Sequence, residues 1–170
     1  KNVETILSAF KKLKKEKKYY SYKLVIVGRR GWLYENIFRK VEELELRNDT
    51  LFIEHVPEEE LPVFYTFAKL YLFPSLYEGF GLPILEAMAC DCPVITSNIS
   101  SMPEVAADAA LLINPLNEGE LVLAIKQVME NKTLQKQMRE KGRAQVQKFS
   151  WKKTAEETKA IYEEQLRSKK

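Results

Sequence analysis

Two glutamates, Glu78 and Glu86, are the only charged residues in the mostly apolar stretch 71–90. No lysine or arginine occurs anywhere from 70 to 125. Because an unpaired carboxylate is costly to bury, each of these glutamates needs polar partners. The two oxygens of a carboxylate can accept hydrogen bonds from two neighbouring hydroxyls, so each glutamate suits a ligand that carries a vicinal diol.

The residues around the two glutamates predict a strand, a glycine-containing loop and a helix. The run 71–73 is short and aromatic and ends at a proline, as a buried strand followed by a turn does. Gly79 and Gly81 permit backbone angles that other residues resist. Pro83 suits the first position of a helix, where its missing N–H costs nothing, and 84–90 continues that helix with good helix formers.

Such a loop would present its backbone to an anion. The N–H groups of Phe80, Gly81 and Leu82 would be free at the positive end of the helix. Glu78 lies at the carboxyl end of the strand and Glu86 on the first helical turn, so the fold would bring them to opposite ends of one small crevice. This arrangement suits a ligand with a hydroxylated ring at each end and an anion in the middle, and a nucleoside diphosphate sugar has that shape.

Taken one at a time, both glutamates have simpler explanations. A glutamate early in a helix usually caps the helix or complements its dipole, as Glu86 could. A loop glutamate such as Glu78 is usually exposed to water. Together they favour a binding site, because neither has a basic residue nearby in the sequence and their apolar neighbours argue against full exposure.

The stretch resembles the signature of the retaining glycosyltransferases of family 4. The resemblance is carried by Glu-Gly-Phe-Gly-Leu-Pro-Ile-Leu-Glu at 78–86, Phe-Pro-Ser at 73–75, Ala-Met-Ala-Cys at 87–90 and Pro-Val-Ile at 93–95. It covers nearly the whole chain, since Lys1-Asn2 resembles the end of the family's first strand-to-helix loop and 149–151 resembles the start of its final helix. The resemblance implies the C-terminal half of the two-domain GT-B fold, which binds the nucleotide-sugar donor.

This resemblance also implies roles for individual residues. Glu78 would be the catalytic residue, in that it holds hydroxyls of the donor sugar, and Glu86 would hold the ribose hydroxyls. Gly79 and the backbone of 80–82 would face the diphosphate or the sugar. The sugar would be transferred with its anomeric configuration kept, through stabilisation of the departing diphosphate rather than through a protein nucleophile. No metal and no cofactor is expected, and the sequence has no Asp-x-Asp metal motif.

Four further residues are candidates for donor binding. Lys1 matches a lysine that the family places on the diphosphate. Gly28 ends an expected strand, and Arg29 beside it could supply a cation near the phosphates; a solvated loop is the alternative, because the Gly-x-Gly-x-x-Gly and Gly-Lys-Ser/Thr patterns are missing. Val56 would border the nucleobase, in a turn where Glu54 stands in place of the family's glycine.

The segment after the expected strand 93–96 has two interpretations. Residues 97–102 could approach the donor. Equally, Ser101 and Glu104 resemble a capping box for a short helix that opens at Pro103. Nearby, Asp91 stands where the family usually has glycine, and aspartate tolerates the left-handed conformation better than most residues.

Alternating strand and helix patterns predict an α/β domain, a Rossmann-like parallel sheet with helices on both faces. Expected helices are 2–18 with Asn2 as cap, 32–46, 58–68, 83–90, a short one from 103, 118–130, 134–149 and 151–167, and expected strands are 23–27, 50–54, 70–73, 93–96 and 110–113. We expect 1–150 to form the nucleotide-sugar-binding domain and 151–170 its C-terminal helix, which would cross toward an N-terminal domain. A doubly wound sheet needs a strand before the first helix, so we expect this chain to be a fragment without that strand and without the acceptor-binding domain.

Length, charge and cysteine content limit which kinds of ligand and partner the chain is expected to bind. A length of 170 residues suffices for one domain with a real core. A net charge of +3 is too mild to indicate nucleic-acid binding. The sequence has no long apolar run and no signal-like start, so a cytoplasmic location is expected. Cys90 and Cys92 are too few for a disulfide framework or a zinc site and are expected to be buried free thiols.

The lysine-rich segment 11–18 leaves two interpretations open. It could make a peripheral contact with anionic lipid at the inner membrane surface. It could also be a solvated helix end, where lysines complement the helix dipole.

The sequence therefore predicts the donor-binding half of a retaining glycosyltransferase. It would move a hexosyl group, mannosyl or glucosyl, from a nucleoside diphosphate sugar to an acceptor hydroxyl in glycan or polysaccharide synthesis. The glycan or lipid-linked acceptor would bind through the N-terminal domain, and the fragment alone is expected to transfer nothing. Alternatives are a non-catalytic nucleotide-binding module and another GT-B enzyme, such as a sugar phosphorylase, which should need a lysine for pyridoxal phosphate within 70–125.

Overall fold

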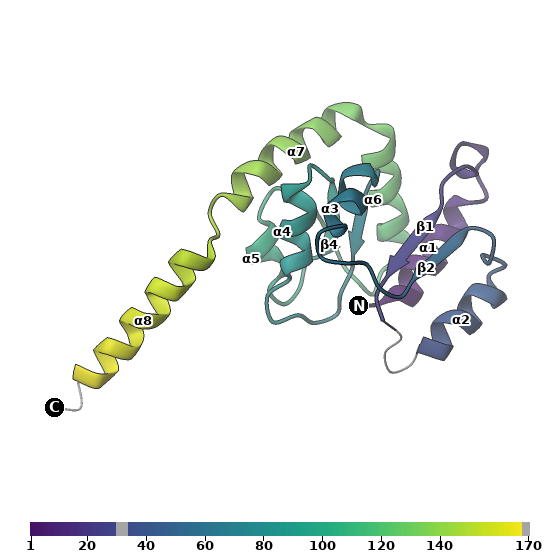
Figure 1. Ribbon diagram of the computed structural model, residues 1–170. Coiled ribbons are helices and arrows are strands. Elements are labelled where there is room, and N and C mark those ends of the chain that lie inside the picture. The colour runs from purple at the N-terminus through teal and green to yellow at the C-terminus, as the bar shows by residue number, and fades with distance from the viewer. Residues whose placement is uncertain (30–33, 168–170) are drawn as a thin grey trace.

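The computed structural model describes residues 1–29 and 34–167, and it confirms an α/β fold with parallel strands and helices on both faces (Figure 1). In the N-terminal part, β1 (Leu24–Val27) pairs in parallel with β2 (Thr50–Ile53). Around these strands lie α1 (Val3–Leu13), the 3₁₀ helix η1 (Lys17–Tyr19) and α2 (Tyr34–Glu43). The predicted start of the second helix, at Trp32 and Leu33, lies outside the described residues.

A second parallel sheet carries the predicted binding loop. Its strands are β3 (Tyr71–Phe73), β4 (Val94–Ser97) and β5 (Leu111–Ile113), in that spatial order. The connecting helices are α3 (Leu61–Phe67) before β3, α4 (Leu82–Ala89) after it and α5 (Met102–Ala106) after β4. Because the three strands are parallel, the loops at their carboxyl ends lie along one edge of the sheet, where open α/β sheets bind ligands.

Strand β4 lies at the centre of the core, and all of its residues are buried. Successive residues of a strand face opposite sides of the sheet. Ile95 packs in one apolar cluster with Ile6 of α1 and Leu121 of α6 (Glu118–Glu130). Val94 packs in another cluster with Met88 of α4. Helices therefore cover both faces of this sheet, as parallel sheets require.

Helix α7 (Lys132–Val146) packs against α4 on its outer side. Both α6 and α7 begin at asparagines, Asn117 and Asn131, whose side-chain oxygens accept a backbone N–H at 3.1 and 2.9 Å. Gly142 of α7 faces Met88 of α4: a Cβ added at 142 would lie 3.2 Å from Met88 Cγ and 3.3 Å from Met88 Cβ. The approach of α7 to the helix behind the binding loop therefore depends on the absence of a side chain at this position.

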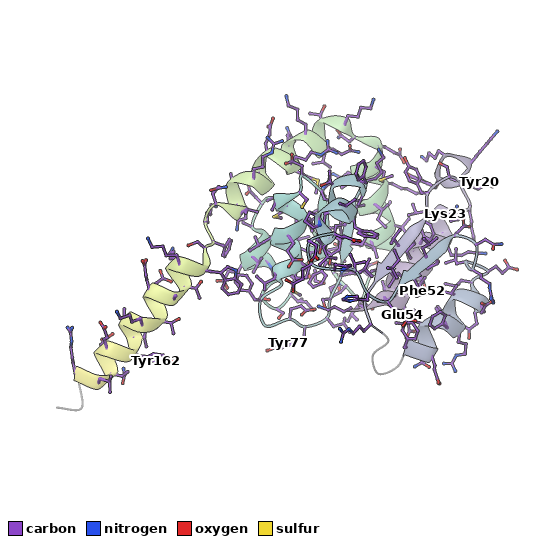
Figure 2. The ribbon with its side chains drawn as sticks, in the orientation of Figure 1. Tyr20, Lys23, Phe52, Glu54, Tyr77 and Tyr162 are labelled. Atoms are coloured by element: carbon purple, nitrogen blue, oxygen red, sulfur yellow. The ribbon has the colours of Figure 1, made fainter. Side chains whose placement is uncertain are left out.

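Helix α8 (Trp151–Arg167) projects away from the rest of the domain (Figure 1). All of its residues are exposed, including Trp151 and Tyr162, and Figure 2 shows Tyr162 far from the sheets. Ion pairs between residues four apart, such as Lys152 with Glu156, lie along the helix surface. Within the described part of the chain, no helix is both long and apolar enough to cross a membrane.

Two expectations about the first helix are wrong. It ends at Leu13 rather than near Lys18, because the lysine-rich residues that follow offer no apolar side chain to bury. Asn2 has a left-handed conformation, with φ 58°, and its side chain does not cap the helix backbone. Its Nδ2 instead donates to the carbonyl oxygens of Pro74 and Pro115 at 3.1 and 2.8 Å. The start of α1 is thus tied to the ends of β3 and β5.

Candidate functional site

The signature loop, residues 74–81, joins β3 to α4 at the carboxyl edge of the sheet. Gly81 directly precedes α4 and has a φ of +108°, which side-chain-bearing residues rarely adopt. The expectation that Gly79 is needed for the same reason is wrong, because its φ is not positive. A Cβ added at Gly79 would meet nothing within 4 Å. The space beside Gly79 is therefore open to a ligand.

The backbone amides beyond this glycine lie at the start of α4. The first N–H groups of a helix have no partner inside the helix. Of the first three residues of α4, Pro83 has no N–H and Ile84 donates its N–H to the carbonyl oxygen of Gly81 at 3.0 Å, which leaves the N–H of Leu82 available to an anion. The side chains of Phe80 and Leu82 are 40% and 41% exposed. The ring of Phe80 meets the ring of Phe149 edge to face, with centroids 5.6 Å apart.

Glu78, in the signature loop, is held by two hydrogen bonds to the same oxygen. Its Oε1 accepts from Ser75 Oγ at 2.5 Å and from Lys1 Nζ at 2.6 Å. Partial burial raises the pKa of Glu78, but the hydrogen bonds from Lys1 and Ser75 outweigh it, so the pKa lies below its usual value. Glu78 is therefore ionised at neutral pH. Its Oε2 has no hydrogen-bond partner among residues 1–29 and 34–167.

Lys1 contacts the signature segment at two residues. Besides its contact with Glu78, its Nζ lies over the ring of Phe73, 4.6 Å from the ring centroid. The residue predicted to hold the diphosphate thus pairs with the residue predicted to hold the sugar. This contact joins positions 77 apart in the sequence, and no local pattern indicates it.

Glu86 lies on the second turn of α4 rather than the first, because the helix begins at Leu82. It is exposed, so the expectation that apolar neighbours would shield it is wrong. Its Oε2 accepts a hydrogen bond from the hydroxyl of Tyr65 on α3 at 3.0 Å. The ring of Tyr65 packs edge to face against Tyr71, with centroids 5.2 Å apart. Burial, together with neighbouring Tyr71 and Glu86, raises the pKa of Tyr65, so its hydroxyl stays a hydrogen-bond donor at neutral pH.

The segment after β4 contacts the signature loop, and the capping-box interpretation is wrong. Ser101 occupies the position before α5, but its side chain makes no capping hydrogen bond. Its Oγ donates to the carbonyl oxygen of Phe80 at 2.7 Å. Ser100 Oγ donates to the carbonyl oxygen of Glu78 at 2.8 Å. The only sequence signal for these contacts is two consecutive serines before a helix. Direct approach of this segment to a donor stays a prediction.

The candidates after β1 and β2 are less closely tied to the loop. Gly28 has a φ of +151°, and a Cβ there would meet nothing within 4 Å. Arg29 is exposed and Val56 is half-buried. No hydrogen bond or ion pair in the described ranges joins these three residues to the two glutamates. Their roles in donor binding stay predictions.

Figure 2 shows how the ends of these loops are arranged. Glu54, which directly follows β2, and Tyr77, beside Glu78, both lie on the lower side of the molecule in this view. The loops after β2 and after β3 therefore open on the same side.

Acidic and thiol side chains form no candidate metal centre in the part of the chain that the structure describes. Both cysteines are free. Cys92 is buried, and burial raises its pKa to about 12. Cys90 is partly exposed, so the expectation of buried thiols holds for Cys92 alone. Asp91 between them has a φ of 58°, the left-handed conformation that was predicted.

Lysines of the segment 11–18 are bound to acidic residues of the domain. Ion pairs join Lys11 to Glu45, Lys12 to Glu118 and Lys14 to Asp49 at 3.0 Å each, and Lys18 to Glu130 at 2.7 Å. Two surface hollows of about 420 and 710 Å³ lie beside Lys14 and Lys126, away from the signature loop. These contacts favour the interpretation of a solvated helix end, and a contact with lipid stays a prediction.

The family model of the glycosyl transferases group 1 matches residues 1–145. The chain belongs to this family. It is 36% identical over 158 residues to the O-antigen chain mannosyltransferase B of Escherichia coli. The aligned region covers 93% of this chain and 41% of that protein. The chain thus spans less than half the length of this curated relative.

Solved structures share the fold. The sucrose-phosphate synthase of Thermosynechococcus elongatus superimposes with a TM-score of 0.86 at 27% identity, over 99% of this chain and 43% of that one. The C-terminal domain of a glycosyl transferase group 1 family protein from Francisella tularensis superimposes with a TM-score of 0.75 at 24% identity, over 87% of this chain and 78% of that one. The fold of this chain is therefore that of the C-terminal half of a GT-B glycosyltransferase.

Proposed function

We propose that this chain binds a nucleoside diphosphate sugar as the donor-binding part of a retaining glycosyltransferase. The observation that supports this proposal is the placement of two carboxylates on either side of one open loop. Glu78, ionised and hydrogen-bonded to Ser75, lies in the loop before its two glycines, and Glu86, exposed and hydrogen-bonded to Tyr65, lies after them on α4. Between them, the loop offers backbone amides and the positive end of α4.

Each group has a role in this mechanism. Glu78 would accept hydrogen bonds from sugar hydroxyls through Oε2 and so orient the anomeric carbon. Glu86 would accept hydrogen bonds from the ribose hydroxyls. Lys1 and the amides of the loop would stabilise the negative charge that develops on the departing diphosphate. A mannosyl group is the favoured sugar for transfer, because the O-antigen relative is a mannosyltransferase.

The acceptor would be a glycan or a lipid-linked glycan. It would be bound by the part of such enzymes with which this chain does not align, since the alignment covers 41% of the mannosyltransferase. Transfer would take place in the cytoplasm, where nucleotide sugars would be the donors. Loss of transfer in a Glu78→Ala variant of the complete enzyme would distinguish catalysis from passive nucleotide binding.

Calorimetry of this chain against GDP, UDP and ADP tests donor binding directly. In the Glu86→Ala variant, affinity for the preferred nucleotide should fall by about 1.5–3 kcal/mol, or about 10–150-fold, because hydrogen bonds to a charged group are lost. Glu140→Ala is the matched control, since it removes an exposed glutamate of α7 on another face. Equal nucleotide affinities of Glu86→Ala and the unmodified chain would refute the ribose role.

A further inference from the structure

Four hydroxyl side chains from β4 and the loop after it donate to backbone carbonyls at the end of β3 and in the segment that follows it; we call them the hydroxyl ladder. Thr96 donates to Phe73 at 2.9 Å, Ser97 to Ser75 at 2.6 Å, Ser100 to Glu78 at 2.8 Å and Ser101 to Phe80 at 2.7 Å. Backbone pairing of β3 with β4 ends at Phe73 and Thr96. The ladder thus extends the contact between these two segments along the signature loop.

Ser101 makes this contact in place of a local one. A serine before a helix normally accepts a hydrogen bond from an N–H of the first turn. Ser101 holds that position before α5 without such a bond. Its Oγ lies closer to the carbonyl oxygen of Phe80, at 2.7 Å, than to that of Glu78, at 3.0 Å, and a hydroxyl has one proton to donate. The side chain is therefore committed to the signature loop.

Ser100 adopts an uncommon backbone conformation, with a φ of 57°. Such a conformation persists where the surroundings over-determine it. The surroundings here are the backbone of Glu78: Ser100 Oγ donates to its carbonyl oxygen at 2.8 Å and accepts from its N–H at 3.3 Å. The side chain of Ser100 is thus joined to both polar groups of one loop residue.

These contacts determine where the loop amides point. In a trans peptide the C=O and the following N–H point in opposite directions, and the described residues contain no cis peptide. Ser100 holds the carbonyl of Glu78, so the N–H of Gly79 points away from Ser100. Ser101 holds the carbonyl of Phe80, so the N–H of Gly81 points away in the same manner. The N–H groups of both glycines therefore point away from the segment that follows β4.

The geometry points to Ser100 and Ser101 as positioning residues that aim the N–H groups of Gly79 and Gly81 at the diphosphate of the donor. They act through the loop carbonyls and do not touch the ligand. The inference rests on the proposed function, which supplies the diphosphate. It adds that the loop's affinity for phosphate depends on two hydroxyls located outside the loop.

The test compares diphosphate with nucleoside binding in single variants of this chain. Ser101→Ala removes one hydroxyl of the ladder. Ser100→Gly removes the other hydroxyl. Glycine readily adopts a φ of 57°, so this variant should keep the backbone conformation. It therefore tests the inference even where Ser101→Ala lowers the melting temperature. Ser101→Thr keeps the hydroxyl. Ser150→Ala is the matched control, because it removes a serine hydroxyl that accepts the N–H of Lys153 at 3.0 Å at the start of α8.

Two quantities are measured in each variant. The first is the ratio of the affinities for GDP, UDP or ADP to those for the matching nucleoside, by calorimetry. We expect this ratio to fall about 10-fold in Ser101→Ala and Ser100→Gly, because diphosphate affinity falls while nucleoside affinity stays unchanged. In Ser101→Thr and Ser150→Ala the ratio should equal that of the unmodified chain. The second is the ¹⁵N order parameter of the amides of Gly79 and Gly81, which should fall in the same two variants.

The outcomes separate this inference from the proposed function. Suppose that the unmodified chain binds a nucleoside diphosphate and that the affinity ratio is unchanged in Ser101→Ala and Ser100→Gly. This result overturns the positioning role alone. Unchanged order of both glycine amides in these variants overturns it as well. An unmodified chain that binds none of the three diphosphates overturns the proposed function, and with it the ligand named here.

Discussion

The ammonium group of Lys1 lies 2.6 Å from the carboxylate of Glu78. Two groups proposed for opposite parts of the donor are thus bound to each other. The Lys1 side chain is 58% exposed, and ion pairs at exposed positions are worth about 0–1 kcal/mol. A diphosphate, with more negative charge than one carboxylate, can therefore attract Lys1 away and leave Glu78 to the sugar.

Substituting Lys1 should raise the pKa of Glu78. Burial raises this pKa, and the hydrogen bonds from Lys1 and Ser75 bring it below its usual value, so Lys1→Met removes one of the two lowering contacts. A ¹³C NMR titration of the Glu78 carboxyl measures the change. Lys17→Met, which removes the same charge elsewhere, should leave this pKa unaltered. An unaltered pKa in Lys1→Met would mean that Ser75 alone holds the carboxylate ionised.

The same carboxylate should make stability depend on acidity. A carboxyl whose pKa is lowered on folding stabilises the protein above its unfolded value, here 4.5, and loses that contribution as pH falls through the folded value. The difference in unfolding free energy between the unmodified chain and Glu78→Gln should therefore be largest near pH 7 and shrink below pH 4.5. Urea unfolding at several pH values measures it. A difference that stays constant with pH would contradict the assignment.

Tyr65→Phe should weaken nucleotide binding without unfolding the chain. The Tyr65 hydroxyl donates to Glu86 Oε2 at 3.0 Å and so restricts an otherwise exposed side chain. Losing one such bond should lower affinity about 3–10-fold. Calorimetry measures the change, and Tyr20→Phe is a suitable control, because Tyr20 is 56% exposed on a distant surface. Equal affinities in the two variants would show that Glu86 does not need its tyrosine.

Alanine at the two glycines of the signature loop should have opposite effects. Gly81→Ala forces a side chain into a φ of +108° and places a Cβ 3.2 Å from Ile84 Cδ1, so it should destabilise the chain by about 1–3 kcal/mol. Gly79→Ala meets nothing within 4 Å and should change stability by less than about 0.5 kcal/mol. Its methyl group would, however, stand in the open space beside the loop and lower diphosphate affinity.

Chemical denaturation and calorimetry on the two alanine variants separate these effects. Destabilisation by Gly79→Ala comparable to that by Gly81→Ala would contradict the difference in their backbone conformations. Unchanged diphosphate affinity in Gly79→Ala would show that the ligand does not approach this glycine.

Much of the fold follows from local sequence patterns. The helices 118–130 and 151–167 have the predicted bounds, because an asparagine cap and a helical pattern of charges mark them locally. Side chains with a choice of partners are predicted less well. Asn2 and Ser101 stand where caps belong, yet both bind backbone carbonyls of the segment after β3. Spacing along the chain does not indicate which partner such a side chain takes.

The candidate site divides in the same way. The loop from Glu78 to Glu86 is contiguous, so its strand, turn and helix can be predicted from residue type. The contacts that hold it come from positions 77, 21 and 22 residues away, through Lys1, Tyr65 and Ser100. Those contacts depend on how the elements pack, which local patterns do not specify.

Gly142 lies outside the candidate site, yet under the proposed function it would influence where one end of the ligand sits. It faces Met88, which follows Glu86 by two positions on α4, while the loop at the other end of the helix is anchored to β4 by the hydroxyl ladder. A larger residue at 142 would push α4 away from α7 and move one carboxylate relative to the other. Under the proposed function, the distance between the sugar and ribose ends of the site would therefore depend on how closely α4 packs against α7.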